Sequence, residues 1–100
     1  MRNKMRPIHP GEVLREDFLV PLKLSANALA HALGVPANRV SSIVAEKRDV
    51  TADTAMRLCR YFGTTPEFWL NLQQAYELRR AELDPKSTAR KVRPREVRAA

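Results

Sequence analysis

The sequence predicts a single all-α domain of five helices. Apolar residues recur at spacings of three and four, and only three glycines interrupt the chain. Prolines or hydroxyl residues also stand where several helices would begin. A chain of 100 residues buries enough surface for one core. We therefore expect a flexible basic N-terminal segment over residues 1–7, a folded domain over 8–84 and a basic tail over 85–100.

The first helix is expected to begin near Pro10, which suits a first turn because its missing N–H would have no partner there. Val13, Leu14 and Phe18 form its apolar side, and Pro21 is expected to stop it. Its outer side is acidic and is expected to stay in water. The acidic residues are Glu12, Glu16 and Asp17.

The second helix begins after Ser25, whose hydroxyl can cap it, and Gly34 ends it. Its inner residues are Leu29, Ala30 and Leu33. The third helix opens with Pro36 in its first turn. Its inner residues are Val40, Ile43 and Val44, which leaves Asn38, Arg39, Ser41, Ser42 and Ala45 on the outer side.

Thr51 is expected to cap the fourth helix, and Gly63 lies just past its end. Its inner residues are Ala55, Leu58, Cys59 and Phe62. Thr65 and Pro66 start the fifth helix, over TPEFWLNLQQAYELRRAEL. Beyond Pro85 the chain has few apolar residues and many charges, so we expect a disordered tail.

The second and third helices, joined around Gly34, match a helix-turn-helix, in which the first helix braces the second against a DNA major groove. An ordinary helical hairpin is the alternative, because two helices around a glycine occur in many folds. Five coincident positions favour the helix-turn-helix. They are a small residue at the helix crossing, the turn glycine and three apolar anchors: Ala30, Gly34, Val35, Val40 and Ile43.

The outer side of the third helix supplies the candidate DNA contacts. Asn38 can bind a base edge bidentately, Ser41 and Ser42 can donate or accept, and Arg39 can reach guanine or phosphate. Because Arg39 is the one charge before Glu46, base readout is expected to be modest and partly shape-based. The phosphate candidates are Ser25 and Asn27 at a helix start and Lys47 and Arg48 in the following turn. The alternative for these four is a capped helix start and a solvated loop.

The fifth helix carries apolar residues over about half its circumference, more than the ~100° that packing on one core requires. These residues are Phe68, Trp69, Leu72, Ala75, Tyr76 and Leu78. Trp69 is expected in the core of its own chain. The predicted dimer interface is Phe68, Leu72, Ala75 and Tyr76, because a palindromic site needs two recognition helices. A terminal helix sunk in its own core is the alternative.

The net charge of +7 lies in the two ends of the chain. Residues 1–6 contribute +3 and residues 86–100 contribute +5, whereas residues 7–85 sum to −1. Such ends suit a polyanionic partner, but solvated disordered ends explain them equally well. Charge alone therefore does not establish nucleic-acid binding.

The sequence argues against an enzyme, a cofactor or a metal site. His9 and His31 are far apart, and no catalytic triad, CxxC pair or phosphate-cradling loop is present. We expect His9 at the surface, His31 partly exposed and Cys59 in the core. A lone cysteine, no signal peptide and no membrane-length apolar run predict a cytoplasmic protein without membrane contact.

The stretch from IHPGEVLREDFL through FGTTPEFWLNLQ, residues 8–73, resembles the HigA antitoxins, a branch of the Cro/CI-type (XRE) helix-turn-helix proteins. HPGE, TADTAMRL and FGTTPEFWLNLQ are the motifs of that branch. The resemblance implies a five-helix, lambda-repressor-like domain that dimerises and binds palindromic operator DNA. It also implies neutralisation of a HigB-type toxin, a ribosome-dependent mRNA endonuclease of the RelE kind, and repression of the operon that encodes both proteins.

By the same resemblance, the base-facing positions are Pro36, Ala37, Asn38, Ser41 and Ser42. The first helix and the N-terminal segment are available to the toxin, and the acidic side described above could meet a basic nuclease. Two further functions stay open. One is a stand-alone XRE-family transcriptional regulator without a toxin, and the other is a protein-interaction module that has lost DNA binding.

Overall fold

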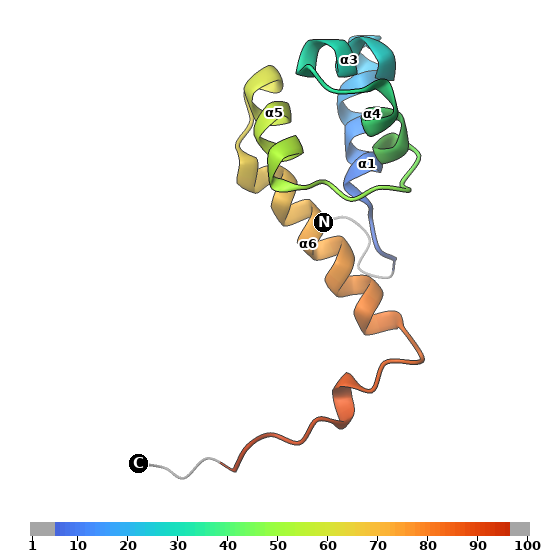
Figure 1. Ribbon diagram of the computed structural model, residues 1–100. Coiled ribbons are helices and arrows are strands. Elements are labelled where there is room, and N and C mark those ends of the chain that lie inside the picture. The colour runs from blue at the N-terminus through green and yellow to red at the C-terminus, as the bar shows by residue number, and fades with distance from the viewer. Residues whose placement is uncertain (1–5, 97–100) are drawn as a thin grey trace.

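The computed structural model describes residues 6–96, and within that range the chain forms five helical rods and no strand. The first rod consists of α1 (Pro10–Val13), the π-helical segment η1 (Leu14–Leu19) and α2 (Val20–Leu22). The other rods are α3 (Ala26–Leu33), α4 (Ala37–Val44), α5 (Ala52–Phe62) and α6 (Pro66–Leu83), followed by the short 3-10 turn η2 (Ala89–Lys91). The first rod, α3, α4 and α5 gather at one end, and α6 carries the chain away from them (Figure 1). This confirms the all-α class and the five predicted helices.

The first rod does not stop at Pro21, so that prediction was wrong. Helical structure continues to Leu22, and Lys23 ends it in the left-handed conformation with φ 54°. The Val20 amide donates to the Arg15 carbonyl, five residues back. Because this wider π turn replaces the regular ladder just before the proline, the ring fits where an α-helix would clash.

The other helix ends follow the sequence closely. Ser25, Thr51 and Thr65 each accept a hydrogen bond from an amide three residues on, as N-caps do. Gly34 and Gly63 end α3 and α5 with φ 72° and 74°. Pro36 stands at the N-cap of α4, one residue before the first-turn position that we predicted.

His9 is buried, with 2% of its surface exposed, so the prediction of a surface histidine was wrong. Its Nδ1 accepts from the Gly11 amide at 2.8 Å and caps α1, and its ring meets the Tyr76 ring edge-on at 4.7 Å between centroids. Burial lowers the pKa of His9. Sequence patterns do not reveal this role, because the contact with Tyr76 spans most of the chain.

Gly11 lets the start of the first rod approach α4. A Cβ atom at this position would lie 1.8 Å from the carbonyl oxygen of Ile43. Only a residue without a side chain fits there. The HPGE motif is therefore a helix start that packs directly on α4.

The core lies between the first rod, α3, α4, α5 and the first half of α6. Trp69 is fully buried, as predicted, and its Nε1 donates to Thr64 Oγ1 at 2.8 Å. Gln73 is buried as well, and its Oε1 accepts from the Val50 amide at 2.7 Å. Cys59 is half-buried at the edge of the core, which agrees only in part with a core cysteine. His31 is exposed.

The C-terminal tail leads away from the helices (Figure 1). Apart from half-buried Ser87, its residues from Pro85 to Glu96 are exposed, and η2 is the one helical segment among them. In residues 6–96 no helix is both long and apolar enough to cross a lipid bilayer.

Candidate nucleic-acid interface

The helix pair α3–α4 has the geometry of a helix-turn-helix, and its two helices lie side by side in Figure 1. Ala30, at the crossing, has 1% of its surface exposed, and Val35 in the turn is half-buried. Val40 and Ile43 point into the core, each with 1% exposed. The inner side of α4 is therefore the predicted one, although Val44 is only half-buried.

The outer side of α4 is polar and open. Four of the five expected base-facing positions are exposed: Pro36, Ala37, Asn38 and Ser41. Ser42 is half-buried at the edge of this surface. An α-helix that presents small polar side chains in this way can lie in a DNA major groove, because no bulky group keeps the backbone away from the base edges.

Arg39 lies at the flank of α4 that faces α5, with 30% of its side chain exposed. Its Nη1 lies 2.8 Å from Asp53 Oδ2, at the start of α5. Asp53 also accepts from Arg57 Nε at 3.0 Å, and Arg57 Nη1 donates to the Leu33 carbonyl at 2.8 Å. Hydrogen bonds from Arg57 and then Arg39 lower the pKa of Asp53.

The expected phosphate contacts occupy two places. Ser25 and Asn27 are exposed at the start of α3, although the Ser25 hydroxyl already accepts from the Ala28 amide at 3.0 Å. Lys47 and Arg48 are exposed just past α4. Free amides at a helix start and two cations beside a recognition helix suit an anionic backbone.

The C-terminal end of α4 is held by Arg15, a residue for which we had predicted no role. Arg15 Nη1 donates to the Val44 carbonyl, and its Nη2 lies 3.3 Å from Glu46 Oε2. Glu46 follows the helix in the left-handed conformation, with φ 63°. The first rod therefore holds the last two residues of α4, Ile43 through Gly11 and Val44 through Arg15.

The acidic side of the first rod is less open than predicted. Glu12 is half-buried, and both of its carboxylate oxygens accept from Arg6, at 2.9 Å each. Glu16 is exposed but pairs with Arg15 Nε at 2.9 Å, and Asp17 is exposed. The expectation that all three acids stay in water was therefore wrong for Glu12.

The four predicted dimer residues divide into two pairs. Phe68 and Ala75 are exposed on α6, Phe68 by 38%. Leu72 and Tyr76 are half-buried, because Leu72 packs against the core and Tyr76 contacts His9. Leu78 is exposed by 60% on the same helix. The apolar surface left open on α6 is therefore displaced away from Tyr76.

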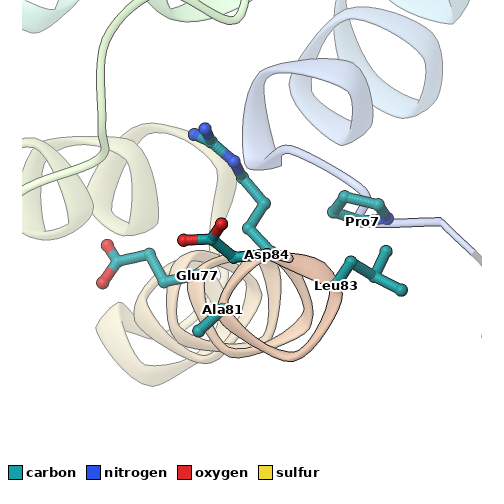
Figure 2. Close-up of a pocket in the computed structure, with 6 residues that line it drawn as sticks. Pro7, Glu77, Ala81, Leu83 and Asp84 are labelled. Atoms are coloured by element: carbon teal, nitrogen blue, oxygen red, sulfur yellow. The ribbon is translucent and has the colours of Figure 1, made fainter. Parts of the chain in front are cut away.

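An open hollow of about 550 Å³ lies between the N-terminal segment and the last turns of α6 (Figure 2). Its lining consists of Pro7, Glu77, Arg80, Ala81, Leu83 and Asp84. None of these residues belongs to α3 or α4, so the hollow is separate from the candidate DNA surface.

The part of the chain that the structure describes, residues 6–96, offers no metal site. It contains no group of three histidine, cysteine or carboxylate side chains that could hold a metal ion.

Comparison with known proteins agrees with this geometry. The helix-turn-helix family model matches residues 14–69. Virulence-associated protein I of Dichelobacter nodosus is 56% identical over 86% of this chain and 80% of its own length. Antitoxin HigA-1 of Vibrio cholerae is 43% identical over 77% and 72%. An uncharacterized HTH-type transcriptional regulator of Haemophilus influenzae is 45% identical over 73% and 68%.

Two solved structures extend the match to almost the whole chain. Antitoxin HigA of Pseudomonas aeruginosa, solved with the higBA promoter, has a TM-score of 0.82 at 48% identity and covers 89% of this chain and 98% of its own. Antitoxin GraA in complex with its operator has a TM-score of 0.86 at 49% identity and covers 98% and 99%. The chain therefore belongs to the helix-turn-helix family and, within it, to the HigA-type antitoxins.

Proposed function

We propose that this chain forms a cytoplasmic homodimer that binds operator DNA and represses its own operon. It also neutralises a HigB-type mRNA endonuclease, and it needs no cofactor. The observation that carries the DNA-binding part is the exposed polar outer side of α4, in a fold shared with an antitoxin solved on its operator. The toxin partner is supported by the similarity to HigA antitoxins.

The DNA contacts divide into two roles in this proposal. Asn38 and Ser41, both exposed, read base edges together with Pro36, Ala37 and Ser42. Ser25, Asn27, Lys47 and Arg48 contact phosphates and set the position of the protein on the duplex.

Fluorescence anisotropy with DNA from upstream of the gene, and with a scrambled duplex of equal length, tests these roles. Asn38→Ala and Ser41→Ala should each weaken upstream binding by about 1–3 kcal/mol and leave scrambled binding almost unchanged. Lys47→Ala should weaken both and reduce the salt slope by about one. Equal losses on both duplexes from all three variants would contradict the assignment.

Neutralisation is tested by growth. Induction of a HigB-type toxin from the neighbouring gene should stop growth, and co-expression of this chain should restore it. We place the toxin contact on the first rod, so Glu16→Lys with Asp17→Lys should abolish rescue while DNA binding persists. If the double variant restores growth as well as the unsubstituted chain does, the first rod is not part of the toxin interface.

A stand-alone regulator is the second candidate, favoured by the relative named as an HTH-type transcriptional regulator. This candidate predicts the same preference for upstream DNA and no rescue of toxin-arrested cells. The growth assay therefore separates the two functions.

A further inference from the structure

We infer that Asp53 is a positioning residue that makes DNA binding by this chain selective, because it holds the guanidinium of Arg39 in one orientation at the junction of α4 and α5. The inference rests on the proposed DNA binding and adds a residue on α5 to the recognition surface.

The contacts around Asp53 form a chain from one helix to the next. Arg39 on α4 and Arg57 on α5 both donate to the same oxygen, Asp53 Oδ2, at 2.8 and 3.0 Å. Arg57 is anchored in turn on the last carbonyl of α3, that of Leu33, at 2.8 Å. Asp53 thus links α4 to α5 directly and, through Arg57, to the end of α3.

The carboxylate of Asp53 lies where its charge alone would disfavour DNA binding. Asp53 lies in a small cleft whose other lining residues are Arg39, Arg48, Asp49, Thr51 and Thr54. A negative charge beside a DNA-binding helix repels phosphates and weakens binding to every sequence. Its charge alone would therefore only weaken DNA binding, whereas the hydrogen bond from Arg39 gives the carboxylate a geometric role.

Asp53 restricts the orientation of Arg39, the one charged side chain of α4. A free arginine samples many rotamers and finds acceptors on almost any DNA. Arg39 uses Nη1 for Asp53, which leaves its other N–H donors available to an acceptor on the DNA. Such a side chain binds well only where the duplex places an acceptor oxygen at that point, on guanine or on a phosphate.

The test compares Asp53→Asn with Asp49→Asn. Asp49 lines the same cleft and is exposed, but it makes no hydrogen bond to Arg39, so its variant removes one charge without the positioning contact. Affinities for upstream and scrambled DNA are measured for both. Both variants should bind scrambled DNA several-fold more tightly. Only Asp53→Asn should lower the ratio of upstream to scrambled affinity, by roughly tenfold.

A double-mutant cycle with Arg39→Ala tests whether the effect of Asp53→Asn depends on Arg39. In that background, Asp53→Asn should leave the affinity ratio unchanged, because there is no side chain left to position. If the Arg39→Ala loss is confined to duplexes with one particular base pair, the acceptor is guanine. If instead it is spread over all duplexes of operator shape with a smaller salt slope, the acceptor is a phosphate. Either pattern with the coupling supports the inference.

Three results would overturn it. The first is a ratio of upstream to scrambled affinity that is the same for Asp53→Asn and Asp49→Asn. The second is a fall in that ratio on Asp53→Asn that is equally large with and without Arg39→Ala. The third is free rotation of the Arg39 guanidinium in NMR spectra of the unbound wild-type protein. Thermal unfolding of each variant, with Asp53→Glu retaining the charge, separates positioning from damage to α5. If the wild-type chain shows no preference for upstream DNA, the proposed function fails as well. If the wild type is selective and Asp53→Asn keeps the same selectivity, only this inference fails.

Discussion

His9 shows how much one side chain can do when it is buried at a helix start. It caps α1 through Nδ1, and its ring lies against Tyr76 on α6. The cap requires the neutral ring, because Nδ1 must accept a hydrogen bond, and burial lowers the pKa of His9 from its ordinary value of 6.5. The unfolded chain therefore takes up a proton at a higher pH than the folded chain does.

This difference gives a pH dependence of stability with a defined sign. The contribution of neutral His9 is fully present above about pH 6.5 and is lost as the pH falls through the lowered folded value. His9→Asn keeps a capping oxygen without a titrating ring, so its free energy of unfolding should change less between pH 7 and pH 5 than that of the wild type. Urea titrations at each pH measure this. His31→Asn, at an exposed site, should keep the wild-type slope.

Gly11 and Gly63 show two different physical reasons for a glycine, close packing at position 11 and a left-handed backbone at position 63. Gly11→Ala forces a Cβ against the Ile43 carbonyl and should cost about 3 kcal/mol of stability. At Gly63 no atom lies within 4 Å of the added Cβ, but φ is +74°, so Gly63→Ala should cost only about 1 kcal/mol. Chemical denaturation of both variants gives the comparison. Equal losses would show that close packing against Ile43 is not the main reason for glycine at position 11.

Residues with local roles could be predicted from the sequence, and residues with distant partners could not. Ser25, Thr51 and Thr65 act on amides three residues away, so their spacing alone identifies them. Arg39 and Asp53 are 14 residues apart, and Arg15 and Val44 are 29 apart. Such pairs exist only once the helices have packed. The candidate surface was therefore predicted, and the network that supports it was not.

At the scale of elements, the first rod packs against the C-terminal end of α4, the helix that we propose reads DNA. Its start packs on Ile43 through Gly11, and Arg15 from η1 binds the last carbonyl of α4. The helical period predicted the rod itself. The continuation past Pro21 was not predictable from residue preferences, because it depends on the π segment just before the proline.

Arg15→Ala should loosen the C-terminal end of α4 rather than the whole fold. Without its guanidinium, the Val44 carbonyl and the Glu46 carboxylate lose their partner, at a cost of about 1–2 kcal/mol. Amide exchange should accelerate from Ala45 to Lys47 and stay unchanged in α5. Arg60→Ala, an exposed arginine on α5, is the control. Uniform acceleration along the chain would indicate a global effect instead.

At the scale of the whole molecule, α6 is the element that extends beyond the core (Figure 1). The sequence predicted more apolar surface on it than one core needs. The structure keeps Phe68 and Ala75 open, and half-buries Leu72 and Tyr76 in the chain's own fold. A probe of dimerisation should therefore avoid Tyr76, because its loss would also disturb His9.

Ala75→Asp is the cleaner variant. A carboxylate at this exposed position should be excluded from an apolar interface, and the dimer should dissociate without loss of helical content. Gln74→Asp, exposed on the neighbouring position of α6, adds the same charge outside the predicted surface and should leave the dimer intact. Sedimentation equilibrium reports the mass. A dimeric Ala75→Asp would move the twofold interface off this side of α6.

Trp69 also equips the protein with its own optical probe. It is the only tryptophan in the chain, fully enclosed, with its indole nitrogen bonded to Thr64. Its emission should lie at short wavelength in the native state and shift to the red when water reaches the ring. Because the indole joins α6 to the rest of the core, one unlabelled sample in a fluorimeter follows the loss of that packing directly.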